Sequence, residues 1–201
     1  MIQIDLKRVR EAVAILQNGG IVVYPTETVY GIGCDPLNRE ACGKVNRLKK
    51  RNQSKPFILL ADSLKTVEKF AGHIDTVTRK LAGEFWPGPL TMIIRPVQSL
   101  PGHLYGPSGG VAFRVTSCPV AAILSREFGQ PVISTSANIT GSKPVIRYKD
   151  AVNTFGKLAD IILENTEKPE GKPSTVIDLT SSEPEILRIG SISEKHLQEV
   201  L

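Results

Sequence analysis

The chain has 201 residues, of which 41% are hydrophobic and 22% are charged. These proportions are ordinary for a globular protein and exclude a disordered or fibrous chain. The 25 Lys and Arg residues exceed the 20 Asp and Glu residues, and the resulting net charge of +5 suits an anionic partner without choosing between RNA, a nucleotide and a phosphate.

Segments with helical periodicity alternate with short apolar runs along most of the chain. In the first half of the chain we expect a helix ending at Gly19-Gly20, a strand over 21–24, a helix from 38 to 48, a strand over 57–60, and helices from 62 and from 75 to 85. Strands over 90–94 and 111–115 and a helix over 119–128 follow. The rest of the chain is expected to form a strand over 131–134, a helix over 147–155 and strands over 160–163, 175–179 and 185–189. The alternation predicts one α/β domain over residues 1–201, with a twisted mixed sheet flanked by helices. The strands after 161 either join this sheet or form a flap, and the pattern leaves both open.

Several common signatures are absent. The chain has no GxxxxGK[ST] phosphate loop, no GxGxxG after a strand and no GxSxG elbow. No stretch approaches the roughly 20 apolar residues of a membrane helix. The three cysteines and three histidines are scattered without metal-ligand spacing. We therefore expect a cytoplasmic protein that does not bind membranes and has no protein-ligated metal.

Two polar clusters lie at predicted strand ends. Residues 24–31 contain two Thr hydroxyls, one carboxylate and two Tyr side chains, which supply many hydrogen-bond donors and acceptors. Residues 134–138 follow the apolar run 131–133 and supply three hydroxyls and one amide. Both clusters suit ligand binding, and both are equally typical of turns and helix caps.

Cations form a further cluster at the end of the helix from 38 to 48. Residues 47–51 and Lys55 supply five positive charges within nine positions. They are consistent with a phosphate clamp, and also with the ordinary preference of cations for helix C-termini.

Lone polar side chains also lie in or beside the later strands. Arg114 interrupts the apolar strand 111–115, and such a cation is costly to bury without an anion. A ligand carboxylate and an internal ion pair with Glu27 or Asp178 are equally good interpretations. Ser174 and Arg188 lie at the ends of two other predicted strands.

Taken together and in this order, the clusters resemble the YrdC-like family, the L-threonylcarbamoyladenylate synthases of tRNA modification. The shared motifs are YPTETVYGIGCD (24–35), the K-x-R pattern at 49–51, WPGPLT (86–91), the S-x-N pattern at 136–138, STVID (174–178) and LRIG (187–190). The resemblance implies a YrdC-like fold with a concave, positively charged cleft. It also implies the reaction of L-threonine, bicarbonate or CO2, and ATP to give threonylcarbamoyladenylate and pyrophosphate.

The resemblance carries site roles over to this chain, motif by motif. It implies catalytic roles for Lys49 and Arg51; threonine binding by Thr28, Arg114 and Ser174; and ATP binding by Arg51, Lys55, Ser134, Ser136, Asn138 and Arg188. Mg2+ is expected to arrive with ATP and without dedicated protein ligands. The implied partners are the proteins that transfer the threonylcarbamoyl group to tRNA, and weak direct binding of tRNA stays open.

Two departures from the family pattern keep alternatives open. Some members have a histidine at the threonine pocket where this chain has Leu60. Longer relatives add a linker and a second domain, so we expect the short single-domain form.

One alternative function is that of an RNA-binding protein without catalysis, although the chain is only 5% aromatic and offers few side chains for base stacking. The other is a divergent paralogue that acts on a different carbamoyl or amino-acid substrate.

Overall fold

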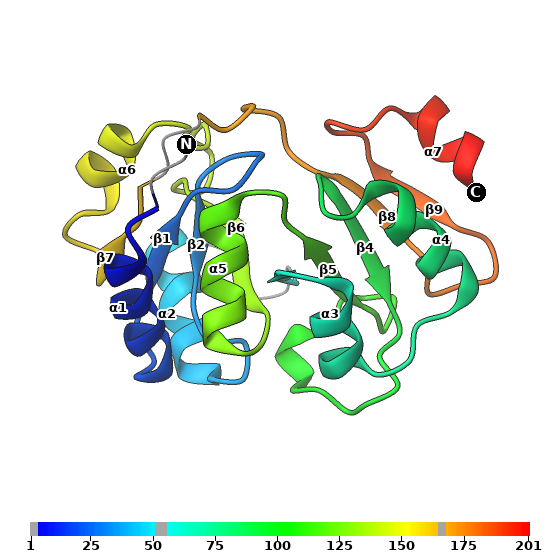
Figure 1. The fold of residues 1–201 in the computed structure, drawn as a ribbon, viewed down its shortest axis with the longest axis horizontal. Helices are drawn as coiled ribbons and strands as arrows, with labels where there is room; N and C mark the ends of the chain where they lie inside the picture. The colour runs from blue at the N-terminus through cyan, green and yellow to red at the C-terminus, as the bar shows by residue number, and fades with distance from the viewer. Residues whose placement is uncertain (1–3, 51–55, 165–167) are drawn as a thin grey trace.

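A computed structural model describes residues 4–50, 56–164 and 168–201. All the described strands join one sheet of nine strands in the order β7-β1-β2-β6-β3-β5-β4-β8-β9 (Figure 1). The strands are β1 (Val22–Tyr24), β2 (Gly31–Gly33), β3 (Ile58–Ala61), β4 (Leu90–Ile94), β5 (Val111–Val115), β6 (Val132–Ser136), β7 (Ile161–Ile162), β8 (Thr175–Asp178) and β9 (Glu185–Arg188). The sheet contains both parallel pairs such as β3–β5 and antiparallel pairs such as β3–β6, which confirms the mixed α/β sheet.

The helices of the described chain are α1 (Leu6–Gln17), α2 (Arg39–Lys49), α3 (Leu64–Ala71), α4 (Thr76–Phe85), α5 (Pro119–Phe128), α6 (Tyr148–Phe155) and α7 (Glu194–Val200), with one 3-10 turn at Gly102–Leu104. Short polar side chains start several of them. The side chains of Asn38, Ser63 and Asp75 accept hydrogen bonds from backbone N–H groups in the first turns of α2, α3 and α4, because those N–H groups have no partner within the helix. None of the helices in the described ranges is long and apolar enough to cross a membrane.

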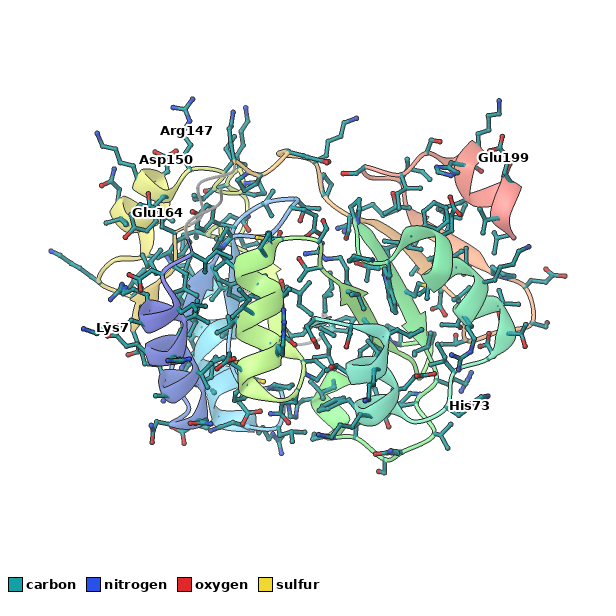
Figure 2. The ribbon with its side chains drawn as sticks, in the orientation of Figure 1. Lys7, His73, Arg147, Asp150, Glu164 and Glu199 are labelled. Atoms are coloured by element: carbon teal, nitrogen blue, oxygen red, sulfur yellow. The ribbon has the colours of Figure 1, made fainter. Side chains whose placement is uncertain are left out.

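Two apolar clusters hold the layers together. Helices α1 and α5 pack over one face of the sheet, where Leu16, Leu124, Tyr24 and Val132 are buried. The larger cluster lies on the other side and includes side chains from α2, α3, α4, α6 and α7. Charged side chains such as Lys7, Arg147 and Glu199 lie at the periphery instead (Figure 2).

The last three strands settle the question left open for the tail. Strand β7 pairs with β1 at one edge of the sheet, whereas β8 pairs with β4 and β9 with β8 at the other edge. They therefore belong to the main sheet and do not form a separate flap. Residues 168–174 lead into β8 and lie between these two edges, where the backbone N–H groups of Glu170 and Gly171 donate to the carbonyl oxygens of Glu27 and Thr28 (Figure 1).

Strand β6 is longer than expected. It continues through Thr135 and Ser136, two residues beyond the predicted end at Ser134, because these two residues pair with Ile32 and Gly31 of β2. The pattern also missed β2 itself, whose Gly-Ile-Gly sequence has low strand propensity. Gly33 is required there because a Cβ atom would lie 2.4 Å from the carbonyl oxygen of Ile133.

Candidate functional site

A cavity of about 670 Å³ opens at the centre of the sheet. Side-chain alternation along β6 places Ser134 and Ser136 on the same face as Val132, which packs beneath α1 and α5. The cavity therefore lies on the same face of the sheet as α1 and α5, next to the area that these helices cover. It is lined by the loop between β1 and β2, the end of α2, strands β3, β5 and β6, and the segment leading into β8.

Every predicted site residue in the described part of the chain lines this cavity. These residues are Thr28, Lys49, Arg114, Ser134, Ser136, Asn138, Ser174 and Arg188. They come from six separate segments, and only the fold brings them together. Arg51 and Lys55, the other two predicted residues, lie outside the described residues.

Lys49 lies at the end of α2, with its side chain directed at the turn after β6. Its Nζ atom donates to the carbonyl oxygens of Ser136 and Asn138 and, at 2.8 Å, to the side-chain oxygen of Asn138. Ser136 Oγ donates to the same side-chain oxygen at 2.7 Å. Although Lys49 is only 4% exposed, it borders the cavity. The lysine of the K-x-R pattern and both polar residues of the S-x-N pattern thus form one hydrogen-bonded unit.

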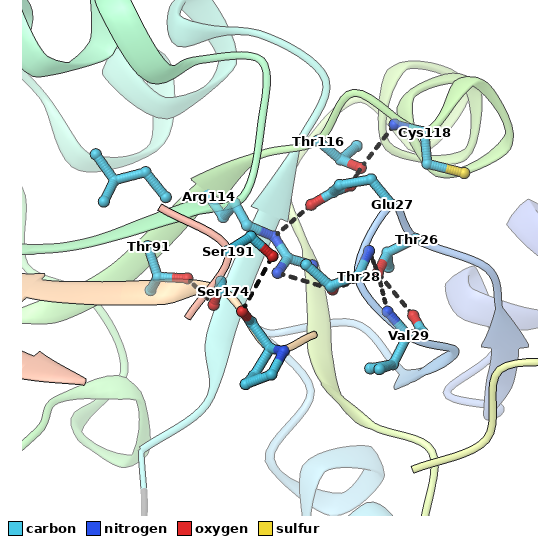
Figure 3. Close-up of polar contacts among 12 residues, drawn as sticks. Thr26, Glu27, Thr28, Val29, Thr91, Arg114, Thr116, Cys118, Ser174 and Ser191 are labelled. Carbon is cyan, nitrogen blue, oxygen red and sulfur yellow. Dashed lines mark hydrogen bonds and ion pairs between the residues drawn. The ribbon is translucent and has the colours of Figure 1, made fainter. Parts of the chain in front are cut away.

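Arg114 is the second buried cation of the site, 4% exposed. Its Nε atom lies 3.3 Å from Oε1 of Glu27, and one of its terminal nitrogens donates to Thr28 Oγ1 at 3.2 Å (Figure 3). The hydroxyl of Thr28 is in turn 2.8 Å from that of Thr26. Of the two acids considered as partners, Glu27 is therefore the one that pairs with Arg114.

Arg188 approaches the cavity from β9. Its Nε atom donates to the carbonyl oxygen of Ser174 at 3.0 Å, and its terminal nitrogen donates to Ser174 Oγ at 3.1 Å. Partial burial of the guanidinium, together with the nearby positive charge of Arg114, lowers the pKa of Arg188. Among the described residues, three cationic side chains thus line the cavity and no Asp or Glu does, an arrangement suited to an anionic ligand.

The sequence reasoning missed several residues that complete the site. Thr116 donates a short hydrogen bond to the second carboxylate oxygen of Glu27, and Thr91 lies 2.9 Å from Ser174 Oγ (Figure 3). Thr140 Oγ1 donates to the carbonyl oxygen of Lys49 at 2.8 Å. Position 116 has a detectable signal, because it is the first polar residue after the strand that carries Arg114. The other two have none.

Leu60, the departure noted in the family pattern, is not among the residues that line the cavity. It is 1% exposed and packs in the apolar cluster under α1 and α5. In the sheet it is the register partner of Arg114, so it lies directly beside the arginine.

Comparison with known proteins gives this arrangement a context. A family model described as "Telomere recombination", covering Sua5, YciO and YrdC, matches residues 14–190. The chain belongs to the Sua5/YciO/YrdC family. The threonylcarbamoyl-AMP synthase of Coxiella burnetii is 38% identical over 90% of this chain and 96% of its own length, and that of Methylococcus capsulatus is 46% identical over 68% and 74%.

Solved structures of the family share the fold. Sua5 from P. abyssi, crystallised with L-threonine, superposes with a TM-score of 0.92 at 31% identity, covering 99% of this chain and 58% of its own. This chain therefore spans a little over half of that longer protein. E. coli YciO superposes with a TM-score of 0.83 at 28% identity, covering 94% of this chain and 92% of its own.

Proposed function

We propose that this chain is a threonylcarbamoyl-AMP synthase, a nucleotidyltransferase that makes threonylcarbamoyladenylate and pyrophosphate from L-threonine, bicarbonate or CO2, and ATP. This reaction is the first step of threonylcarbamoyladenosine formation in tRNA. The observation that carries the proposal is the convergence of all eight described site residues on one cavity, in a chain that is similar to such synthases over 90% of its length. We further propose that residues 1–201 act as one cytoplasmic domain.

In this proposal the amino acid occupies the side of the cavity near Arg114. The terminal nitrogens of Arg114 bind its carboxylate, while Thr28 and Ser174 contact its polar groups. The L-threonine complex of the similar Sua5 supports this choice of amino acid. The nucleotide lies against Ser134, Ser136 and Asn138, with Arg188 on its phosphate side.

The chemistry needs charge neutralisation more than a protein nucleophile. An oxygen of the carbamate formed on the threonine amine attacks the α-phosphorus, and the bond from that phosphorus to the β-bridging oxygen breaks, so that pyrophosphate leaves with the electron pair. Negative charge then accumulates among oxygens that already repel one another. Positioning and cationic side chains supply most of the catalysis in such transfers, and we assign this role to Lys49 and Arg51, with Lys55 beside them binding ATP.

The residues present suit Mg2+ bound by the substrate more than by the protein. Within the described ranges, no group of three or more His, Cys, Asp and Glu side chains could hold a metal ion. Glu27, the carboxylate beside the cavity, is already engaged by Arg114 and Thr116. Mg2+ commonly keeps waters and substrate phosphates as ligands, so we propose that it enters with ATP as the metal–nucleotide complex. The proteins that receive the product and act on tRNA are likewise part of the proposal.

The decisive experiment incubates the purified protein with ATP, Mg2+, bicarbonate and L-threonine. We expect pyrophosphate and a product with the mass of threonylcarbamoyl-AMP, both dependent on threonine and on bicarbonate. Pyrophosphate that forms with serine or carbamoyl phosphate in preference to threonine would support the divergent paralogue instead. RNA binding at physiological salt without nucleotide binding would overturn the enzymatic proposal.

A pair of variants tests the K-x-R assignment. Arg51→Ala should lower product formation at least about a hundredfold, since loss of one preorganised donor to a charged transition state costs about 2.7–4 kcal/mol. Lys50→Gln is the matched control, because it also removes one positive charge from this segment and Lys50 is an exposed residue with no assigned role in the site. Near-normal turnover of Arg51→Ala would contradict the role of Arg51.

A further inference from the structure

The ion pair between Glu27 and Arg114 has a geometry that bears on substrate orientation. Glu27 belongs to the loop between β1 and β2, Arg114 to β5, and their side chains are 11% and 5% exposed. Charged groups this well buried are costly unless they are paired and oriented. The loop therefore positions the arginine and does more than border the cavity.

Glu27 contacts one edge of the guanidinium. A guanidinium can bind a carboxylate with two parallel hydrogen bonds either through Nε and one terminal nitrogen or through its two terminal nitrogens. In this structure Oε1 of Glu27 lies 3.3 Å from the Nε atom as an ion pair, without the alignment of a hydrogen bond. Because the Glu27 carboxylate occupies the space beside Nε, two parallel hydrogen bonds to a ligand carboxylate are open only at the terminal edge, where one nitrogen also donates to Thr28.

Glu27 is itself held by hydrogen bonds to its side chain and to its main chain. Thr116 Oγ1 donates to Oε2 of Glu27, and the same hydroxyl accepts from the backbone N–H of Cys118 at 3.1 Å (Figure 3). On the other side, the backbone N–H of Glu170 donates to the carbonyl oxygen of Glu27 at 2.9 Å. Side chain and main chain of Glu27 are thus both anchored to the surrounding structure.

The negative charge of Glu27 has a second consequence. Arg188 lies near enough to Arg114 for their positive charges to repel, and both line the same cavity. A guanidinium held only by the hydroxyl of Thr28 could turn away from that repulsion. The carboxylate of Glu27 opposes this movement and keeps Arg114 in place before an anionic ligand arrives.

We propose that Glu27, braced by Thr116, is a positioning residue that leaves only the terminal edge of Arg114 to bind the carboxylate of the amino-acid substrate. The proposal rests on the proposed function for the identity of that substrate. Glu27 does not touch the substrate, so its effect should be confined to recognition of the carboxylate. Binding of ATP, which lies on the Lys49 side, should not change.

The test measures binding of L-threonine and of L-threoninamide, which lacks the carboxylate, by calorimetry in the absence of bicarbonate. Glu27→Gln keeps the shape and an oxygen acceptor but removes the charge. We expect it to reduce the preference for threonine over threoninamide by about tenfold, with ATP affinity within about twofold of the wild type. General structural damage would weaken both ligands alike and would leave the preference unchanged, which would overturn the proposal.

A second pair of variants covers the case in which Glu27→Gln does not fold. Thr116→Val removes the hydroxyl that braces Glu27 and should reduce the same preference, whereas Thr116→Ser keeps the hydroxyl and should restore it. Tighter threonine binding by Glu27→Gln would mean that Glu27 competes with the ligand, and would also overturn the proposal. If wild-type protein binds neither ligand, the proposed amino-acid substrate fails and the assignment to Glu27 fails with it. An unchanged preference in a wild-type protein that binds threonine rejects Glu27 alone.

Discussion

Lys49 Nζ and the side-chain oxygen of Asn138 are 2.8 Å apart, although the two residues are separated by 89 positions in the chain. The contact joins the end of α2 to the turn after β6. Because the same ammonium also donates to two carbonyl oxygens of that turn, the cation both borders the cavity and holds the turn that forms the proposed nucleotide side. Position and charge are therefore difficult to separate at Lys49.

Lys49→Met should impair both activity and stability. We expect kcat/KM for ATP to fall at least about a hundredfold, and the free energy of unfolding to fall by about 1–3 kcal/mol because buried carbonyl oxygens lose their donor. Steady-state kinetics and urea unfolding would measure the two effects. Lys44→Met is the matched control on α2, since Lys44 contacts Gly19 and Glu40 away from the cavity. If it is as inactive as Lys49→Met, a general effect on α2 accounts for the loss.

Arg114→Lys separates charge from geometry at the second buried cation. Lysine keeps the positive charge but cannot contact Glu27, Thr28 and a carboxylate through one planar group. We expect KM for threonine to rise at least about tenfold, while KM for ATP changes much less. The control is Arg95→Lys, because Arg95 donates to the carbonyl oxygen of Thr180 at an exposed position. An unchanged KM for threonine in Arg114→Lys would argue against binding of the threonine carboxylate by two hydrogen bonds from the Arg114 guanidinium.

Local sequence signals predicted most of the elements. The strands over 90–94 and 111–115 and the helix over 119–128 have the predicted bounds, because apolar runs and prolines or glycines mark their limits. Strand β2 and helix α7 were missed. Strand β2 forms because its glycines let the neighbouring strands approach closely. Helix α7 is short and has one buried residue, Leu197, so its apolar pattern is weak.

The motifs grouped residues that the fold brings to one cavity, whereas the geometry of that cavity was not predictable. Ordered motifs identified Thr28, Arg114 and Ser174 as members of one site, and all three line the cavity. No local pattern could choose between Glu27 and Asp178 as the partner of Arg114, since both are distant in sequence. The fold determines which acid pairs with Arg114. The loop after β1 places Glu27 beside Arg114 of β5, whereas the Asp178 carboxylate accepts hydrogen bonds from Thr180.

Asp178 gives the fold a predictable dependence on acid. Burial opposes its ionisation, but hydrogen bonds from the hydroxyl and backbone N–H of Thr180 and from Ser108, with the charge of Arg95, outweigh burial and lower the pKa of this carboxyl below its ordinary value of 3.8. A carboxyl with a depressed native pKa stabilises the fold fully above its unfolded pKa, and this stabilisation is lost as the pH falls through the native pKa.

The wild-type protein should therefore lose stability below about pH 4 partly through Asp178. Urea unfolding between pH 3 and pH 7 should show a shallower decline for Asp178→Asn, which is expected to be less stable than the wild type at neutral pH. The two proteins should converge towards the acid end of the series. Parallel curves for the two proteins would show that this carboxyl does not contribute to the acid sensitivity.

Gly190, the last residue of the LRIG motif, packs closely against the backbone of Pro173 and Ser174, which line the cavity. A Cβ atom at this position would lie 2.2 Å from the carbonyl oxygen of Pro173 and 2.5 Å from the carbonyl carbon of Ser174. These are backbone atoms that cannot rotate away, and Ser174 holds Arg188. A side chain at 190 must therefore displace Pro173 and Ser174, which line the cavity.

Gly190→Ala should lower the free energy of unfolding by about 1–3 kcal/mol, as overpacking does, and should weaken threonine binding in the protein that stays folded. Gly83→Ala is the control, because position 83 lies in α4 and an added Cβ would meet no described atom within 4 Å beyond its neighbours and the helix's own backbone. Alanine there should leave threonine binding unchanged and stabilise the helix by about 0.5–1 kcal/mol. Thermal unfolding and calorimetry would measure both effects. A Gly190→Ala protein with wild-type stability and affinity would mean that β9 moves freely, and that Arg188 is held less firmly than its two hydrogen bonds to Ser174 indicate.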